Sequence, residues 1–520
     1  MMLTTPAEAW RRLAKRDRAA FSAPTIEVFT PAFTGSGSGR NARVMQVLFG
    51  ARIASGTTSR SGSMMKSFFS LLPLLVVFIT PTLHTHSNHK IKDRPVVFAH
   101  VAVIDAAGGS VQQDMTVVIV GDHIAEVGKA AAVKIPRSAQ LIDGRGKFLM
   151  PGLWDMHIHT FGHNPRSTRS WYFPLLVANG VTGVRDMWTT GDEFPQVAQW
   201  RKGLAEGSFL GPRFGAVGWL VDGPAPVHPG SDVVSTPQEA RDFVRRAKAA
   251  GVDFVKVYTK LQPEEYFAIA DEAKKAGIPF EGHVPDAVRA AAASDAGQRT
   301  MEHLRNINIA CSSKEEELMQ ATWGPQQRKE MFETYDHQKC ERLVERFARN
   351  QTWQVPTAVL FWGEHSMTDP RMKYVTSEFR EKWRRLPVRP VDTQAHHMGL
   401  TVVGMMNKAG VPMMAGTDLA NPFIYPGFSL HDELALFVED GLTPGEALKT
   451  ATYNPAKFLG ILDRLGTVEK GKVADLVLID ANPLEDIHNT QKIRAVVMNG
   501  RYLDRPALDK LLADAAAAAR

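Results

Sequence analysis

Short apolar runs alternate with helix-like stretches across residues 151–460, and this alternation constrains the fold more than any other feature. It is typical of β–α units whose strands form a parallel sheet. Eight such units predict an α/β fold, a (β/α)8 TIM barrel with an insert at 305–351. The strands are expected at 153–160, 182–187, 214–221, 254–259, 279–284, 300–304, 352–361 and 411–417.

Both ends of the chain outside this region have the pattern of short strands. Residues 91–150 contain alternating apolar segments separated by turns at 107–109 and 121–122, and similar segments return at 461–505. We therefore expect one small β-sandwich built from both segments. Residues 506–520 are expected to form a C-terminal helix or tail.

The first 90 residues differ from the rest in charge and hydropathy. Residues 1–63 carry nine Lys or Arg and three Asp or Glu, which equals the whole formal excess of +6. Within 64–90, Met64, Met65 and Lys66 precede an apolar run at 67–80, which is typical of a secretory signal peptide over 64–83. The sequence therefore predicts a start at Met64 or Met65, a non-native or disordered 1–63, and a periplasmic or secreted protein. The alternative is a genuine basic extension before a membrane anchor.

The charge balance bears on the partners of the protein. Because the part after residue 63 is neutral overall and has no basic stripe, it lacks the electrostatic pattern of a nucleic-acid-binding surface. We expect a small-molecule or short-peptide substrate and no nucleic acid, and a homo-oligomer is compatible with the sequence. Two cysteines, Cys311 and Cys340, cannot form a disulfide framework, and the sequence leaves open whether they pair.

Four histidines fall at the ends of predicted strands. His157 and His159 are two residues apart, so a strand points both rings to the same side. His283 and His303 are 20 residues apart, one β–α repeat, which places them at matching heights on adjacent strands. A lone buried histidine is usually structural, but converging imidazoles are good ligands for zinc.

A lysine and an aspartate complete the cluster. Lys256 shares a strand face with Phe254 and Tyr258 and is expected to point into the barrel, where an unpaired ammonium is costly. It would either pair with an interior carboxylate or, beside metal ions, take up CO2 as a carbamate. Asp418 ends the last predicted strand, where it would bind metal or cap the next helix.

These six residues, with their neighbours, closely resemble the amidohydrolase superfamily over about residues 95–503. The first two histidines stand in the pattern Pro-Gly-Leu-x-Asp-x-His-x-His (151–159), and Gly-Val-Arg-Asp-Met (183–187), Ala-Thr-x-Asn-Pro-Ala (451–456) and Gly-Lys-Val-Ala-Asp-Leu (471–476) also agree. The segment Phe-Val-Lys-Val-Tyr (254–258) and the close histidine spacing resemble the prolidase-like branch. That branch includes Xaa-Pro dipeptidases, carboxypeptidases acting on basic residues and ochratoxin-type amidases.

The resemblance implies a binuclear site for two divalent ions, with zinc as the expected metal. His157, His159 and Asp418 would hold one ion and His283 and His303 the other, with carboxylated Lys256 and a hydroxide bridging them. Hydroxide would attack the scissile carbonyl, and Asp418 would accept its proton and return it to the departing amine.

Two further residues have roles that the sequence leaves open. Tyr258 would either donate a hydrogen bond to the oxyanion or pack in the core. Arg185 would either bind a substrate carboxylate or pair with Asp186.

The expected reaction is hydrolysis of an amide bond in a dipeptide or an N-acyl amino acid. The same ligands also serve hydrolases of cyclic amides, lactones and phosphoesters, so the fold and the ligands do not choose among these bonds. A non-catalytic binding protein on the same barrel is the alternative from another class. That alternative predicts a missing ligand, and the sequence lacks none of the six.

Overall fold

The computed structural model describes residues 94–161, 168–322, 324–363, 365–386 and 393–520, and all of these belong to one compact unit, 84–520. The segments interpreted as an N-terminal extension (1–63) and a signal peptide (64–90) lie outside the described residues. Among the helices in the described ranges, none is long and apolar enough to cross a bilayer.

Parallel strands form the central sheet, in the order β13-β12-β11-β10-β8-β7-β6, and a short strand, β9 (Asp232–Val233), pairs with β8. Every residue of β7 and β10 is buried, as expected for strands covered on both faces. The bounds are β6 Leu153–Ile158, β7 Val181–Thr189, β8 Arg213–Asp222, β10 Phe254–Val257, β11 Phe280–Gly282, β12 Thr300–Glu302 and β13 Trp353–Val355.

The segment 411–419 closes this sheet into a barrel, although it is not a regular strand. It bridges to β13 through Gln354 and Met413, and to β6 through Ile158 and Leu419. The backbone N–H of Met156 also donates to Ala415 O at 2.9 Å. The α/β barrel predicted from the sequence is therefore confirmed, with its eighth position filled by an extended segment bonded on both sides.

One strand boundary was predicted wrongly. The strand expected at 352–361 ends at Val355, because Thr357 adopts a left-handed conformation (φ 48°) and helix α12 (Ala358–Trp362) begins directly after it. The apolar run at 358–362 thus belongs to a helix, and periodicity alone does not separate the two in so short a segment.

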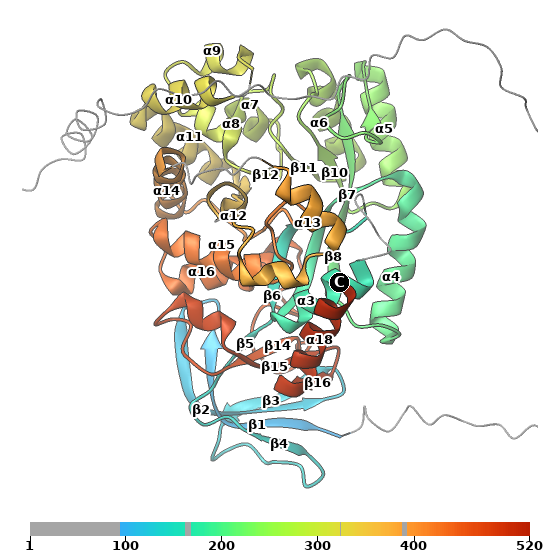
Figure 1. Cartoon of the computed structure of the whole chain (residues 1–520), viewed down its shortest axis with the longest axis vertical. Helices are drawn as coiled ribbons and strands as arrows, with labels where there is room; N and C mark the ends of the chain where they lie inside the picture. The colour runs from blue at the N-terminus through green and yellow to red at the C-terminus, as the bar shows by residue number, and fades with distance from the viewer. Residues whose placement is uncertain (1–93, 162–167, 323, 364, 387–392) are drawn as a thin grey trace, which may run out of the picture. The chain divides into compact units, whose positions relative to one another are not determined.

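The helices that connect successive barrel strands pack around the outside of the barrel (Figure 1). In α5 the Thr236 side chain caps the first turn by accepting from Glu239 N, and Gly251 ends the helix in a left-handed conformation. The elements are η1 Thr168–Tyr172, α3 Phe173–Ala178, η2 Gly191–Glu193, α4 Phe194–Glu206, α5 Pro237–Ala250, α6 Pro263–Ala276, α7 Ala290–Asp295, η3 Pro370–Tyr374, α13 Ser377–Arg384, α14 Thr393–Lys408, α15 Phe428–Glu439, α16 Pro444–Thr450 and α17 Tyr453–Phe458.

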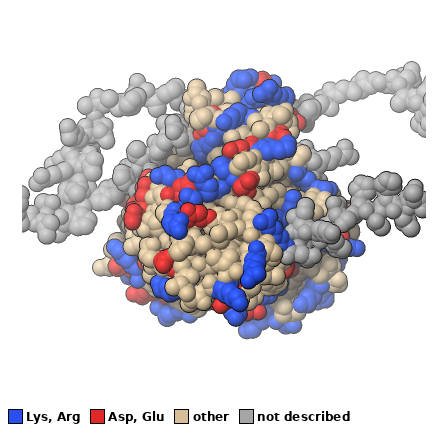
Figure 2. Space-filling view, turned by 90° about the horizontal axis from the view of Figure 1, so that it is seen from below, with Lys and Arg blue, Asp and Glu red and all other residues tan. Residues whose placement is uncertain are grey.

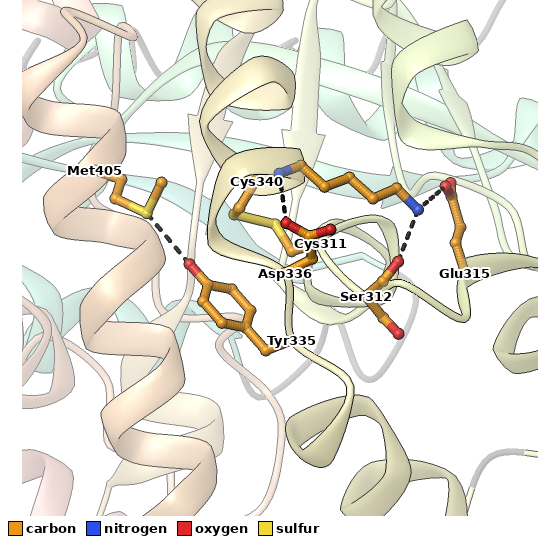
Figure 3. The surroundings of a disulfide bond; sticks show 8 residues. Cys311, Ser312, Glu315, Tyr335, Asp336, Cys340 and Met405 are labelled. Carbon is orange, nitrogen blue, oxygen red and sulfur yellow. Dashed lines mark hydrogen bonds and ion pairs between the residues drawn. A yellow bond between two sulfur atoms is a disulfide. The ribbon is translucent and has the colours of Figure 1, made fainter. Parts of the chain in front are cut away.

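The insert between β12 and β13 is helical, with α8 (Arg305–Ala310), α9 (Glu315–Gln320), α10 (Pro325–Glu333) and α11 (His337–Asn350). A disulfide joins Cys311 at the end of α8 to Cys340 in α11, which answers the pairing question that the sequence left open. Figure 3 shows that Ser312, Glu315 and Asp336 surround this bond. The disulfide thus anchors α8, the helix that directly follows the His303 strand end.

Strands from both ends of the chain share a second, mixed sheet, in the order β16-β15-β14-β5-β1-β2-β3, with β4 paired to β1. Figure 1 shows this sheet below the barrel, and in Figure 2 Lys and Arg intermix with Asp and Glu on the face seen from that side. The bounds are β1 Val96–Asp105, β2 Ser110–Val120, β3 His123–Lys129, β4 Gln140–Asp143, β5 Phe148–Pro151, β14 Leu476–Ile479, β15 Ile493–Met498 and β16 Arg501–Asp504, with η4 Ile487–Gln491 and α18 Arg505–Ala518 beside them.

This sheet feeds directly into the barrel. Gly152 alone separates β5 from β6, and its N–H donates to Asp475 O just before β14. An apolar cluster that includes Phe98, Val117 and Leu476 packs on one face of the sheet. The first barrel strand, which carries two of the predicted site histidines, is thus anchored at its start by both ends of the chain.

Candidate active site

Four imidazole rings and one carboxylate meet where the parallel strands end. The Nε2 atoms of His157 and His159 lie 3.3 and 2.8 Å from Asp418 Oδ1. His303 Nε2 lies 3.8 Å from Asp418 Oδ2 and 3.1 Å from His283 Nε2. The structure therefore brings together these five residues of the set chosen from the sequence.

Local backbone geometry explains how the chain aims these groups. His157 and His159 are two residues apart at the end of β6, so in the extended chain both rings project from the same face. His303 and Asp418 instead have positive φ angles of 67° and 59°, which are uncommon for residues other than glycine. Such backbone strain is concentrated at functional sites, and here it turns both side chains toward the shared centre.

The other ring nitrogen of three histidines meets an oxygen atom of a neighbouring element. At His157 the partner is a carboxylate, which accepts a hydrogen bond, so Nδ1 carries the proton and Nε2 keeps a lone pair, the usual state of a metal-ligating imidazole. The threonine hydroxyls at the other two can either donate or accept. The pairs are His157–Glu302 at 2.8 Å, His283–Thr259 at 3.0 Å and His303–Thr357 at 2.6 Å.

The protonation tendencies of these groups suit metal binding. Burial, and after it the charge of Lys256, holds the pKa of His157 and His283 well below the ordinary value. Burial also lowers the pKa of His303 to about 4. For Asp418 burial acts to raise the pKa, but attraction to His157 and the hydrogen bond with His159 outweigh it and hold the pKa well below its ordinary value. At neutral pH His157, His283 and His303 are therefore neutral beside an anionic carboxylate.

Lys256 on β10 is fully buried beside this cluster. Its Nζ has no hydrogen-bond partner among the described residues, so the interior ion pair that the sequence left open is not observed. Burial lowers the pKa of this amine to about 8. A buried, readily neutralised amine is costly to leave unpaired, so it fits a site in which a further group would engage it.

The donor set fits divalent metal. His157, His159 and Asp418 offer ligand atoms that all lie within 4.8 Å of one another. His283 Nε2 and His303 Nε2 lie 3.1 Å apart. Two nitrogen ligands of one tetrahedral zinc ion lie roughly 3.3 Å apart, given bonds of about 2.0–2.1 Å. Nitrogen and oxygen donors of this kind suit zinc and similar ions.

Tyr258 lies at the edge of the cluster. Its hydroxyl lies 2.8 Å from His228 Nε2, and its ring centre lies 4.0 Å from that of His283. Burial raises the pKa of Tyr258 far above its ordinary value, so the phenol keeps its proton. Tyr258 therefore borders the pocket, and its partner His228 comes from the loop after β8.

Arg185 lies below the site and does not reach the pocket. Its side chain is 0% exposed. Its guanidinium donates to Met156 O, Glu281 and Glu302 at 2.6, 2.8 and 2.8 Å. Both roles considered from the sequence, binding a substrate carboxylate and pairing with Asp186, are therefore wrong, because adjacent residues on a strand point to opposite sides and the guanidinium is enclosed by two other carboxylates.

Several residues of the site were missed. Glu302, Thr259 and Thr357 hold the imidazoles, and His228 holds Tyr258. One signal was available, because a glutamate shortly precedes both His283 and His303 in the sequence. The threonines and the loop histidine have no comparable signal.

A cavity of about 220 Å³ opens above the cluster. Most of the residues in its wall are polar or charged, and a smaller number are apolar. Besides the site residues Tyr258, Thr259, His283, Glu302, His303 and Asp418, it is lined by Val284, Asp286, Arg305, Asn306, Ile307, Leu360 and Phe361.

Comparisons with known proteins agree with this geometry. The Amidohydrolase family model matches residues 148–503. An ochratoxinase from Aspergillus niger is 25% identical over 461 residues, covering 77% of this chain and 84% of the relative. A candidate prolidase from Bifidobacterium longum has a similar structure, with a TM-score of 0.59, 25% identity and coverage of 81% of this chain and 99% of that one. A bottromycin amidohydrolase, with a TM-score of 0.62, 24% identity and coverage of 81% and 90%, shares the fold.

The family match spans both the barrel and the returning strands of the mixed sheet, and it includes all six residues that the sequence singled out. The branch resembled, that of prolidases and ochratoxinase, is confirmed by the same comparisons. The chain therefore belongs to the amidohydrolase family and is a hydrolase that acts on amide C–N bonds.

Proposed function

We propose that this hydrolase cleaves the amide bond of dipeptides or N-acyl amino acids and that it holds two divalent ions, preferably zinc. The supporting observation is a cluster at the ends of the parallel strands, in which the Nε2 atoms of three histidines lie near Asp418 and that of His283 lies beside His303 Nε2. His157, His159 and Asp418 would hold one ion, and His283 and His303 the other.

Lys256 would join the two halves as a carbamate. Carbamate formation needs a neutral amine, and the lowered pKa of about 8 makes that form accessible near neutral pH. Addition of CO2 to Nζ with loss of a proton gives an anionic group with two oxygen ligands. The unpartnered position of Nζ beside the cluster supports this assignment.

Bound divalent ions would lower the pKa of water and polarise a carbonyl oxygen. The residues of the chain supply the proton transfers. Asp418, anionic at neutral pH, would accept a proton from the attacking water and pass it to the departing amine. Tyr258, held by His228, would donate a hydrogen bond to the oxyanion that develops on the former carbonyl.

The pocket supports a small acyl-amino substrate. Leu360 and Phe361 contribute apolar surface to its wall, and Arg305 and Asn306 contribute polar groups. The Arg305 side chain is 26% exposed and lies 3.2 Å from Asp286. A cation in this wall favours a substrate with a free carboxylate, as dipeptides and N-acyl amino acids have.

Metal analysis of the purified protein, followed by a panel of dipeptides and N-acyl amino acids, tests the proposal. We expect two equivalents of metal per chain and turnover that depends on them. The panel should include a cyclic amide, a lactone and a phosphoester as matched alternatives. Turnover confined to one of those alternatives would replace the proposed substrate class. Metal binding without turnover of any compound would contradict the proposed activity.

We also propose that the mature protein is secreted or periplasmic. The signal-like segment 64–83 supports this, as does the disulfide between Cys311 and Cys340, since such bonds persist mainly in oxidising compartments. N-terminal sequencing of the protein from its native source tests it. A mature terminus shortly after the apolar run is expected, whereas a terminus near Met1 would contradict it.

A further inference from the structure

A buried charge network lies directly beneath the candidate metal centre. Arg185 stands at its middle on β7, with a side chain 0% exposed, and its contacts reach three other barrel strands. Its NH2 atom lies 2.8 and 3.0 Å from the two Glu302 oxygens on β12, and its NH1 atom lies 2.8 Å from Glu281 on β11. Its Nε donates to Met156 O on β6 at 2.6 Å.

The network is too costly to be incidental. A buried guanidinium and two buried carboxylates each lose their hydration, and only close pairing offsets that loss. Glu281 has a second cation, Arg299, at 3.4 Å. Glu302 forms ion pairs with Arg185 and His157, and Thr300 donates a hydrogen bond to it.

The two carboxylates differ in one respect that bears on the metal centre. Glu302 Oε2 lies 2.8 Å from His157 Nδ1, whereas Glu281 contacts two arginines, Arg185 and Arg299. An ionised carboxylate can only accept a hydrogen bond, so it keeps the proton on Nδ1 and leaves the Nε2 lone pair free. A charged acceptor also makes the imidazole a stronger ligand.

Arg185 acts on the same histidine by two routes. It holds the Glu302 carboxylate through both oxygens, and it holds the carbonyl of Met156, the residue directly before His157. Both the ring and the backbone of His157 are therefore tied to one guanidinium. Lysine could not make these contacts together, because it lacks the planar fork of donors.

We propose that Arg185 and Glu302 are positioning residues that set the tautomer, orientation and basicity of His157 as a metal ligand. The inference rests on the proposed function, because it assumes that His157 holds an ion. We assign both residues to the support of His157, although Glu302 also borders the pocket. Their effect is expected first in metal affinity and only through it in turnover.

The test compares Glu302→Gln with Glu281→Gln. Both variants replace a buried carboxylate that pairs with Arg185, and only the first changes the partner of His157. Zinc affinity is measured by titrating the purified full-length proteins against a competing chelator, and folding is checked by thermal melting of the metal-free proteins. We expect Glu302→Gln to lower the affinity of one ion by about 10–100-fold and Glu281→Gln to leave it close to the wild type.

A second pair of variants covers the case in which Glu302→Gln does not fold. Glu302→Asp keeps the charge opposite Arg185 but withdraws it from His157, and it should show the same selective loss of one ion. Arg185→Lys should lose affinity as well, because the fork is absent. Supplying excess zinc should restore most of the turnover of these variants, which a change in the chemical step would not allow.

Equal affinity losses in the Glu302 and Glu281 variants, or wild-type affinity in both Glu302 variants, would overturn the inference and leave a structural network only. Failure of the proposed function has a different result, since the wild-type protein itself would then bind no zinc or hydrolyse no amide. The two failures are therefore distinguishable in one set of measurements.

Discussion

The two halves of the candidate metal centre are supported by different chemistry. His157, in the half shared with His159 and Asp418, has a carboxylate behind its ring, because its Nδ1 faces Glu302 at 2.8 Å. His283 and His303 instead have threonine hydroxyls behind their rings, at 3.0 and 2.6 Å. The first half thus has charged support and the second has neutral support.

The halves also differ in access. Both histidines of the second half, His283 and His303, line the pocket, whereas the first half lines it through Asp418 and not through His157 or His159. His157 lies above the buried network of Arg185, and 1% of its side chain is exposed, against 10% for His159 and 11% for His303. We therefore expect the first half to hold its ion more tightly and the second to exchange its ion more readily with solvent.

Asp418→Asn removes the group that both halves share. One of its oxygens faces His157 and His159 and the other faces His303. The amide keeps an oxygen ligand but accepts no proton, so kcat should fall by about 10²–10⁴-fold while metal is retained. Steady-state kinetics with metal analysis checks this. A variant that kept most of its kcat would remove Asp418 from proton transfer.

Lys256→Ala removes the proposed bridge between the halves. A bridging carbamate would bind the metal directly. Its removal should therefore lower metal affinity by more than the factor of about 10–100 expected for a residue that only hydrogen-bonds a ligand. A short carboxylic acid added to the variant should restore part of the activity by replacing the carbamate. If the variant retained both ions and full activity, the two halves would not be bridged through this residue.

Thr357→Val should weaken only the pocket-side half. It removes the oxygen that His303 Nδ1 meets, so the affinity of the second ion should fall by about 10-fold while the first is unchanged. Thr189→Val, a buried threonine on β7 that donates to Gly218 O, is the matched control. Loss of the first ion before the second in a chelator titration would reverse the proposed order of the halves.

The pKa of Lys256 makes loading of the centre depend on pH. Burial lowers this pKa to about 8, so the amine is mostly charged at pH 7 and mostly neutral at pH 9. At constant dissolved CO2, zinc loading of the metal-free protein should become about tenfold faster over that interval. Stopped-flow or quenched loading assays measure the rate. A rate independent of pH would argue against a carbamate.

Alternation and spacing were sufficient to predict the barrel and the convergence of its histidines. The pattern of residues 151–460 predicted parallel strands, and His157 and His159 share a face because strand side chains alternate. His283 and His303 lie on neighbouring strands, as their spacing of one repeat predicted. These features depend on local periodicity, which a sequence displays directly.

The support beneath the site could not be predicted in this way. Strand alternation would place the side chains of Glu302 and His303 on opposite sides of the strand. Only the positive φ of His303 allows its ring and the Glu302 carboxylate to serve the same centre. Arg185 was misassigned because its two partners, Glu281 and Glu302, follow it by 96 and 117 residues. Nothing local marks such a pairing.

The sequence by itself therefore determined the barrel, the family and the residues that meet at its mouth. Tertiary structure alone decided which oxygen stands behind each imidazole, that Arg185 is enclosed, and that Cys311 pairs with Cys340. The physical reason is that periodic side-chain direction is a property of one segment. Charge pairing and burial, by contrast, depend on which distant segments the closed sheet brings into contact.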